Sequence, residues 1–286
     1  MYKRQGNGSS ELISLLIETR APKRTLILGP TYSEYSRELS FSGSTQDYYH
    51  LQEAEDFELD VEDLCRTLLN GYDFLILCNP NNPTSSAILK DEMRALLSFC
   101  ANRDIFVMID ETYVEFAPSV QEVTAVPYTK DFSNLMVLRG VSKFYAAPGM
   151  RFGYGITGNK EFLSQMKEKQ IPWSLNSLGA YAGEQMFKDT SYIRQTRSLI
   201  LTERDRMFLE LKKMSSFKVY FPYGNFILVK ILKPEVTSFD VFEACIKEGL
   251  MIRDCSSFQC LDGEFIRFCI MKPEDNNRLL KVLRTI

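Results

Sequence analysis

Short runs of consecutive hydrophobic residues alternate along the chain with longer stretches in which hydrophobic residues recur every three or four positions. Runs of the first kind are typical of strands that are buried on both faces of a sheet. Four of them occur in the first half of the chain, at 24–29, 73–78, 104–110 and 134–140. The periodic stretches predict amphipathic helices, at 9–18, 61–71 and 89–103. Strands that alternate with helices indicate βαβ units, so we predict a mostly parallel central sheet flanked by helices.

The pattern changes after Gly155. Residues 191–214 predict one long, charged, amphipathic helix of the kind that bridges two domains. Short strands are expected beyond it at "KVYF", "NFILVKI", "GLMIRDC" and "EFIRFCI", with helices at 238–248 and 273–284. We therefore predict a large α/β domain over 6–204 and a small C-terminal α+β domain over 205–286. The opening residues "MYKRQ" are polar, and we expect no helix or strand before the turn at "GNGSSE".

Composition and charge narrow the class of protein. The 286 residues are 45% hydrophobic and 25% charged, as in an ordinary globular protein. A net charge of −3 argues against nucleic acid or an anionic membrane as the partner, and no apolar run approaches the roughly 20 residues of a spanning helix. Seven cysteines without tight CxxC pairs predict free thiols in a reducing compartment, so we expect a cytoplasmic protein.

The chain contains a single histidine, His50. This count excludes a multi-histidine metal site and a histidine-based triad, and we expect no metal. An enzyme with this composition would carry protons on a lysine, a tyrosine or a carboxylate. His50 itself has no residues around it that resemble a ligand set, so we expect a structural or solvent-exposed role.

Polar motifs follow three of the predicted strands: "LCNPNNPTS", "DETYVEF" and "VSKFYAAPGMR". Parallel α/β sheets bind ligands at the carboxyl ends of their strands, so these motifs are expected to share one crevice. The third motif places Lys143 and Arg151 eight positions apart in a segment that is otherwise apolar enough to be buried.

These motifs resemble those of the class I and II aminotransferases, the fold-type I enzymes that depend on pyridoxal 5′-phosphate. "NGSSE", "GPTYSEY", "NPNNPT", "DETY", "SK…PGMR.GY" and a final "IR" occur in the family's order, from about Gly6 to the C-terminus. The branch of histidinol-phosphate aminotransferases and threonine-phosphate decarboxylases is the most similar. The resemblance implies an aminotransferase that acts on a small, phosphorylated amino acid or amine. It also implies a homodimer, because family sites lie at the subunit boundary.

The resemblance assigns roles around the cofactor ring. Lys143 matches the lysine that forms the Schiff base and, once freed, moves the proton at the substrate's α-carbon; burial or the nearby Arg151 would favour its reactive, neutral form. Asp110 matches the carboxylate that keeps the pyridine nitrogen protonated, although "DET" could instead cap a turn. Asn82 and Tyr113 match the residues that hydrogen-bond the 3′-oxygen of the ring.

Tyr32 matches the aromatic residue that stacks on the ring, with core packing as the alternative. For the cofactor phosphate, the backbone N–H groups of Ser9 and Ser10 would open a helix, and Ser142 and Arg151 match the other ligands. A plain helix N-cap at Ser9 or Ser10 is the alternative.

Two arginines of the small domain match substrate-binding positions. Arg267 matches the arginine that holds the substrate carboxylate with two parallel hydrogen bonds. Arg253 would add a second positive group for a phosphate, unless it makes a surface salt bridge. The segment "RDCSSF" resembles the threonine-phosphate decarboxylases more than the histidinol-phosphate aminotransferases.

The sequence departs from the family pattern in two places. Ser85 stands where the family has glycine, and a positive φ there would strain it mildly. Family members also carry a longer N-terminal segment, with an arm that closes over the substrate and a tyrosine that reaches the partner's site. Three functions stay open: an aminotransferase, an L-threonine-O-3-phosphate decarboxylase, and a non-catalytic or truncated cofactor-binding remnant.

Overall fold

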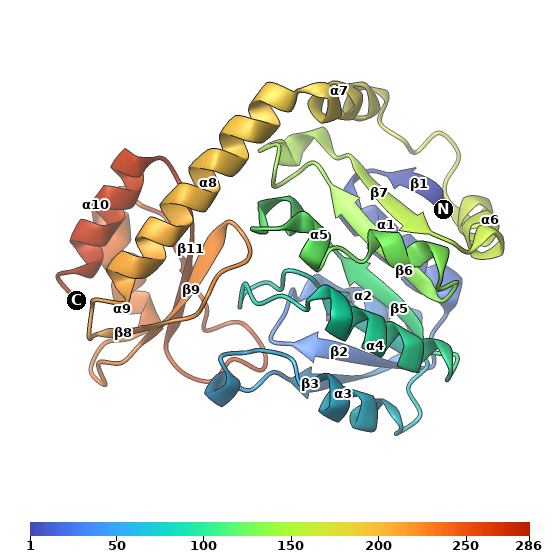
Figure 1. The fold of residues 1–286 in the computed structure, drawn as a ribbon, viewed down its shortest axis with the longest axis horizontal. Coiled ribbons are helices and arrows are strands. Elements are labelled where there is room, and N and C mark those ends of the chain that lie inside the picture. The colour runs from blue at the N-terminus through green and yellow to red at the C-terminus, as the bar shows by residue number, and fades with distance from the viewer.

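A seven-stranded sheet organises the larger part of the computed structural model, which describes residues 1–286 (Figure 1). The strands run in the order β1-β7-β6-β5-β4-β2-β3. Their bounds are Tyr2–Gly6 (β1), Arg24–Gly29 (β2), Thr45–His50 (β3), Phe74–Cys78 (β4), Phe106–Asp110 (β5), Leu135–Gly140 (β6) and Gly153–Thr157 (β7). Strands β2 to β6 are parallel, and β7 pairs antiparallel with both β6 and β1.

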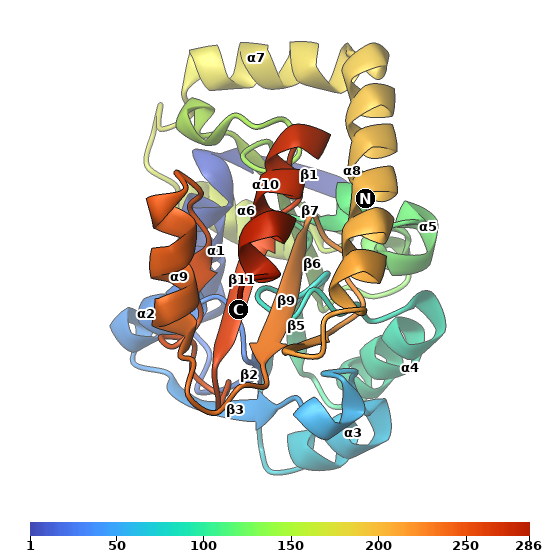
Figure 2. The ribbon, with the colours of Figure 1, turned by 90° about the vertical axis from the view of Figure 1, so that its left-hand side faces the viewer.

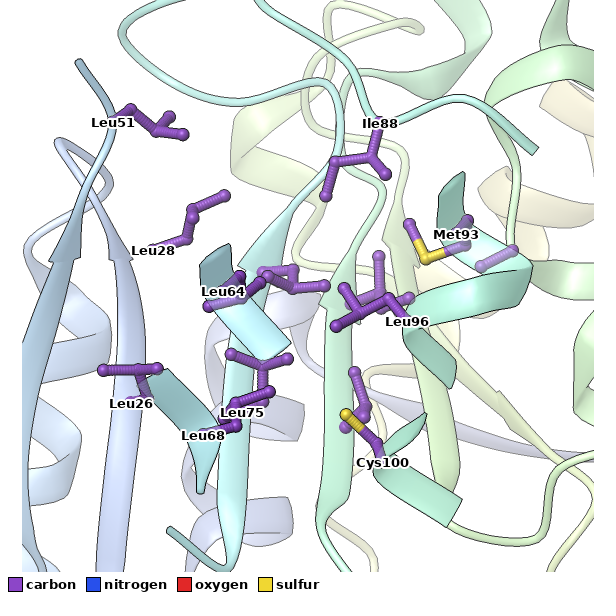
Figure 3. Close-up of a cluster of buried hydrophobic side chains, with 14 of the residues drawn as sticks. Leu26, Leu28, Leu51, Leu64, Leu68, Leu75, Ile88, Met93, Leu96 and Cys100 are labelled. Atoms are coloured by element: carbon purple, nitrogen blue, oxygen red, sulfur yellow. The ribbon is translucent and has the colours of Figure 1, made fainter. Parts of the chain in front are cut away.

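Helices cover both faces of this sheet, because alternate residues of each hydrophobic strand point to opposite sides. On one side Leu26 and Leu75 pack with α3 (Val61–Leu68) and α4 (Lys90–Ala101), as Figure 3 shows. On the other side Ile27 and Ile76 pack with a second set of helices: α1 (Gly8–Arg20), α2 (Glu34–Ser42) and α6 (Lys160–Lys169). The sheet is therefore buried on both faces, as its continuous hydrophobic runs predict.

The C-terminal part forms a separate antiparallel sheet in the order β10-β11-β9-β8. Its strands are Phe217–Val219 (β8), Phe226–Ile231 (β9), Arg253–Asp254 (β10) and Phe265–Cys269 (β11). Helices α9 (Ser238–Lys247) and α10 (Pro273–Leu283) pack on it around a hydrophobic cluster that also includes Phe116 and Phe144 of the large unit. After α7 (Ser177–Lys188), the long helix α8 (Thr190–Leu211) crosses from the large sheet to this smaller unit, as both ribbon views show (Figures 1 and 2).

Shorter helices complete the large unit between its strands. One short α-helix is α5 (Val120–Val123). The short 3-10 helices are η1 (Glu53–Glu55), η2 (Val114–Phe116), η3 (Val126–Lys130) and η4 (Pro148–Met150). No helix of the chain combines the length and the apolar character needed to cross a bilayer, and all seven cysteines are free thiols.

The predicted hydrophobic strands and the seven helices and strands that follow residue 190 are confirmed to within a few residues. The expectation that nothing regular precedes the first turn is wrong. Tyr2–Gly6 form β1, whose Tyr2 lies opposite Thr157 of β7. A polar edge strand carries no hydrophobic run, because its backbone pairing rather than its side chains holds it in place. The domain boundary at 204/205 falls inside α8 and stays a prediction.

Candidate active site

Loops from the carboxyl ends of β4, β5 and β6 meet the first turn of α1 around a cavity of about 240 Å³. All nine residues predicted to hold the cofactor line this cavity: Ser9, Ser10, Tyr32, Asn82, Asp110, Tyr113, Ser142, Lys143 and Arg151. Arg267 lines it as well. Arg253 does not; it lines an adjoining cavity of about 500 Å³, whose wall shares Tyr32, Asn82 and Arg267 with the first.

Asp110, the last residue of β5, lies buried at 4% exposure in the wall of the cavity. Its Oδ2 accepts a hydrogen bond from the Tyr35 hydroxyl at 2.8 Å, and its Oδ1 accepts from the Thr112 backbone N–H at 3.0 Å and from the Thr112 hydroxyl. Burial raises the pKa of the Asp110 carboxyl group, while these hydrogen bonds and the positive charge of Lys143 act in the opposite direction. The hydrogen bonds favour the ionised carboxylate, and a cation in the cavity would offset the cost of its burial.

Tyr35 and Thr112 were missed by the sequence analysis. Both line the cavity and fix the orientation of the Asp110 carboxylate. The signal for Thr112 was present, since an Asp followed two residues later by a hydroxyl residue commonly forms a local side-chain turn. The signal for Tyr35 was weaker, because it is buried among core residues and only its hydroxyl reaches the site.

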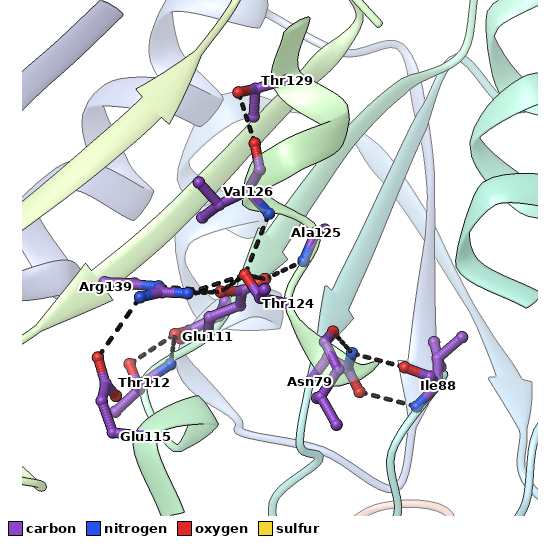
Figure 4. A network of polar contacts seen from close by, with 12 residues as sticks. Asn79, Ile88, Glu111, Thr112, Glu115, Thr124, Ala125, Val126, Thr129 and Arg139 are labelled. Atoms are coloured by element: carbon purple, nitrogen blue, oxygen red, sulfur yellow. Dashed lines mark hydrogen bonds and ion pairs between the residues drawn. The ribbon is translucent and has the colours of Figure 1, made fainter. Parts of the chain in front are cut away.

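A polar network behind the site anchors the strand end (Figure 4). The buried Glu111 carboxylate accepts bonds from Arg139 at 2.7 and 2.9 Å and from the Thr124 hydroxyl at 2.9 Å. Arg139 also lies 3.7 Å from the Glu115 carboxylate. Burial raises the pKa of the Glu115 carboxyl group to about 7, and its Oε2 has no hydrogen-bond partner. Arg139 thus attracts two carboxylates, those of Glu111 and Glu115. These contacts fix the backbone of the loop that carries Asp110 and Tyr113.

The expectation that the Lys143 segment is buried is wrong for its charged residues. Val141 and Phe144 are buried and anchor the loop, whereas Lys143 and Arg151 are exposed. The apolar residues of the motif therefore serve to fix the loop, and the amine stays accessible at the cavity. Lys143 is the one lysine among the residues that line it.

The first turn of α1 forms a cradle of open backbone donors. The first N–H groups of a helix have no partner within it, and the side chain of the N-cap residue Asn7 does not bond them. Asn7 bonds instead with the segment before α7, where it accepts from the Asn176 N–H at 3.0 Å and donates to Ser174. The N–H groups near Ser9 and Ser10 are left to bind an anion.

Arg151 and two glycines complete this cradle. Arg151 has a positive φ of 47°, and its guanidinium donates hydrogen bonds only to the carbonyl groups of Pro148 and Asn7, at 3.0 and 3.4 Å. Gly8 has φ +84°, and any side chain there would collide with that guanidinium. A Cβ at Gly153 would lie 2.7 Å from the Ser9 backbone nitrogen. Both glycines are therefore required by the close approach of β7, Arg151 and α1.

Asn82 and Tyr113 face the cavity with free donor groups. The Oδ1 of Asn82 accepts from the Arg267 guanidinium, which leaves its amide nitrogen available. The Tyr113 ring packs edge-on against Phe226, 4.9 Å between centroids, and its hydroxyl makes no hydrogen bond within the protein. Tyr32 lies beside them with its ring edge-on to Tyr35 at 5.5 Å. Two donors and one aromatic ring therefore surround the same space.

Ser85 adopts the positive φ that the sequence analysis considered, at 62° and fully buried. Its hydroxyl accepts a hydrogen bond from the Gly224 N–H at 2.8 Å, and its carbonyl accepts from the Tyr223 N–H at 2.8 Å. Both partners belong to the C-terminal unit. The serine that departs from the family pattern therefore joins the loop of Asn82 to the small sheet.

Comparison with known proteins gives one family. The model of the family "Aminotransferase class I and II" matches residues 5–283. A relative from Caldanaerobacter subterraneus subsp. tengcongensis, provisionally named threonine-phosphate decarboxylase, is 35% identical over 98% of this chain and 75% of its own length. The threonine-phosphate decarboxylase of Salmonella typhimurium is 31% identical over 98% of this chain and 76% of its own.

A solved structure matches equally well. The crystal structure of the histidinol-phosphate aminotransferase from Clostridium acetobutylicum superposes with a TM-score of 0.92 at 33% identity. The match covers 99% of this chain and 83% of that one. The similar proteins thus carry two different activity names on the same fold.

Proposed function

We propose that this chain, which belongs to the class I and II aminotransferases and has the fold of the fold-type I enzymes, is a pyridoxal 5′-phosphate-dependent aminotransferase acting on a small phosphorylated amino acid or amine. One observation carries the proposal. The cavity that contains Lys143 and Asp110 adjoins a second cavity lined by Arg253 and Arg267, and neither arginine has a carboxylate partner within the protein. An amine, a buried carboxylate and two arginines without carboxylate partners thus lie around two cavities that share a wall.

The residues of the first cavity fit this cofactor. The open N–H groups of α1 and the Arg151 guanidinium suit a phosphate dianion. The buried Asp110 carboxylate suits a protonated ring nitrogen, because a facing cation would offset the cost of burying its charge. The free donors of Asn82 and Tyr113 suit a phenolic oxygen.

When bound, the cofactor supplies an electron sink for the bonds at the substrate's α-carbon. The protein's own groups then have distinct tasks. Lys143 is placed to hold the cofactor and to carry a proton to and from that carbon. Tyr35 and Thr112 keep the Asp110 carboxylate in one orientation. Arg267 holds the substrate carboxylate.

A second candidate function is the decarboxylation of a phosphorylated amino acid such as threonine phosphate. The observation in its favour is that the Salmonella typhimurium relative, 31% identical over nearly the whole chain, carries that name. The two reactions differ in which bond to the α-carbon is broken, a C–H bond or a C–carboxylate bond. Both require the same residues for the cofactor, so the substrate-binding side decides between them.

The test of the enzyme proposal is cofactor binding through Lys143. We expect the purified protein with added pyridoxal 5′-phosphate to show an absorbance band near the edge of the visible range that borohydride reduction removes. Lys143→Ala should lack the band, whereas Lys160→Ala, on the first turn of α6, should keep it. A wild-type protein without the band would contradict the cofactor assignment.

A paired assay separates the two reactions. Threonine phosphate and histidinol phosphate would each be supplied with 2-oxoglutarate, and CO2 release would be measured beside transfer of the amino group. Glutamate formation without CO2 supports the aminotransferase. CO2 release from threonine phosphate without glutamate supports the decarboxylase, and a bound cofactor with neither product supports the remnant.

We also propose that the chain works as a homodimer in the cytoplasm. Large apolar side chains gather without cover around α7: Ile171, Trp173, Leu178 and Tyr181 are 76%, 97%, 75% and 65% exposed. Tyr181 also lines a cavity of about 810 Å³, together with residues of β1, β7 and α7. Exposed apolar patches of this kind favour association with another chain. The same segment is hydrogen-bonded to Asn7 at the phosphate cradle, so a partner here would lie next to the site.

A further inference from the structure

Two arginines of the small sheet stand side by side with their charges uncompensated. Arg253 of β10 lies directly opposite Arg267 of β11 in the strand register. Like charges in that position repel each other, and a carboxylate would normally lie between them. The nearest one on the strand, Asp254, accepts its hydrogen bonds from Ser238 and Ser256 instead, at 2.9 to 3.0 Å. Neither arginine forms a salt bridge.

The ring of Phe258, and no carboxylate, lies near both guanidinium groups. The Phe258 ring centroid lies 5.7 Å from the guanidinium carbon of Arg253 and 6.0 Å from that of Arg267. Phe258 is half-buried and packs against a hydrophobic cluster that contains residues of both units, such as Leu77 and Leu228. Its backbone N–H donates to the Cys255 carbonyl at 3.0 Å, which fixes the loop that carries it. The ring is therefore held in place from two sides and lines the same cavity as both arginines.

We infer that Phe258 is a positioning residue that sets specificity for a phosphorylated substrate, by holding Arg253 and Arg267 together as one doubly charged binding site. This inference rests on the proposed function and names a residue that acts on the substrate through the arginines. An aromatic face attracts guanidinium groups without neutralising them and without occupying their N–H donors. Apart from the hydrogen bonds of Arg253 to Ser257 and of Arg267 to Asn82, the donors of both arginines are thus left for the oxygens of a dianionic phosphate and a carboxylate.

The two arginines depend on Phe258 to different degrees. Arg267 is also held by the Oδ1 of Asn82 and by the Phe226 ring, 5.0 Å from its guanidinium carbon. Arg253 is exposed, and apart from the Phe258 ring it is held only by a 2.8 Å hydrogen bond that it donates to the Ser257 hydroxyl. Removing the ring should therefore release Arg253 and leave Arg267 in place. The loss should fall on the phosphate group of the substrate and spare the carboxylate.

The test uses Phe258→Leu in the cofactor-loaded protein. We expect KM for the phosphorylated substrate to rise about fivefold, as the loss of the one cation–π contact that holds Arg253 predicts, with kcat and the cofactor absorbance unchanged. The inhibition constant of inorganic phosphate should rise by a similar factor, and KM for the same substrate without its phosphate should stay within about twofold. Phe258→Tyr, which keeps the ring, should restore the wild-type values.

Phe242→Leu is the matched control, since Phe242 is also partly buried but packs on the core of the small unit. It should leave all these constants unchanged. If Phe258→Leu does not fold, Phe258→Met carries the same expectation, because methionine fills a similar volume without a ring.

Two results would overturn the inference. Phe258→Leu could raise KM equally for substrates with and without a phosphate, or it could leave both values unchanged. If the wild type prefers the phosphorylated substrate, either result would contradict the role of Phe258 and leave the proposed function standing. A wild-type protein without any preference for a phosphate would contradict the proposed function, and the inference with it.

Discussion

At the scale of single residues, buried carboxylates show how neighbours decide the chemistry of a side chain. Burial raises the pKa of both Asp110 and Glu111, but each accepts several hydrogen bonds that favour its charged form. Glu115 lacks such partners for its Oε2 and is only partly compensated by Arg139. The three carboxylates lie within six residues of one another yet have different tasks: Asp110 lines the cavity, whereas Glu111 and Glu115 share one arginine behind it.

Glu115 gives a prediction on pH. Its carboxyl pKa is about 7 in the folded protein against an ordinary value of 4.5, so the folded state binds a proton more tightly than the unfolded state. The free energy of unfolding should therefore fall as the pH rises from about 4.5 to 7, by roughly 3 kcal/mol from this group. In Glu115→Gln, where no proton is needed, that contribution should vanish. Urea unfolding at a series of pH values measures it.

Glu62→Gln is the control for this prediction. Glu62 is exposed on α3 and forms no salt bridge, so its replacement should leave the pH dependence as it is in the wild type. Equal slopes for the wild type and Glu115→Gln would show that Glu115 is ionised in the folded protein throughout this range.

Ser85 shows what the sequence alone could and could not reveal at this scale. The departure from glycine was visible in the motif, and the φ of 62° in the structure is the positive value for which mild strain was expected. The compensating hydrogen bond from the Gly224 N–H was not, because it joins residues 139 positions apart. For the same reason Lys143, Asp110 and Asn82 were predicted from local motifs to share one crevice, whereas the hydrogen bond from Tyr35 to Asp110 joins residues 75 positions apart and was not predicted.

At the scale of secondary structure, hydrophobic runs predicted the central strands because burial on both faces leaves a strong signal in the sequence. The strands β1, β3 and β7 leave little hydrophobic signal in the sequence, because β1 and β3 are polar edge strands and β7 is glycine-rich. One of these weak elements matters most for the site: β7 brings Gly153 against the first turn of α1.

Gly153→Ala tests this contact between β7 and α1. The added Cβ would lie 2.6 Å from the Gly8 carbonyl carbon and 2.7 Å from the Ser9 nitrogen. Both are backbone atoms that cannot move without displacing the cradle. We expect a loss of about 1–3 kcal/mol in the free energy of unfolding and at least a roughly tenfold weaker Kd for pyridoxal 5′-phosphate, because its phosphate ligands are displaced. Thermal unfolding and an absorbance titration measure the two effects.

Gly149→Ala is the matched control in the same region. A Cβ at Gly149 meets no atom within 4 Å, so this variant should bind the cofactor as the wild type does. If both variants bound it equally well, the cradle could not be the phosphate site.

At the scale of the whole molecule, helix α8 joins the two units through arginines on one side. Arg204, buried at 1% exposure, donates to the carbonyl groups of Phe116 at 3.0 Å, Tyr223 at 3.1 Å and Gly224 at 3.2 Å. The first of these acceptors follows Tyr113 in the large unit and the others belong to the small one. A buried cation that bonds carbonyl groups from both units fixes their relative position, because any separation would remove the acceptors of one unit.

The proposed homodimer is the prediction that belongs to this scale. Sedimentation should give the wild type a mass of twice the 33.0 kDa of one chain. The double variant Leu178→Glu, Tyr181→Glu should sediment as a single chain, because both side chains are exposed and charges there would be desolvated only at an interface. Phe239→Glu, exposed at 54% on α9, should leave the mass unchanged. A wild type that sediments as a single chain would contradict the proposal.

The candidate site is divided between two units, so the distance between the units bears on the length of the substrate that the proposed function would accept. Lys143 belongs to the large sheet, whereas Arg253 and Arg267 belong to the small one, and Ser85 and Arg204 fix the separation between them. A substrate longer by one bond, about 1.5 Å, would have to part these contacts before its α-carbon reached the amine. Under the proposed function, the fixed separation between the units would select substrates by the distance between their amino group and their anionic groups.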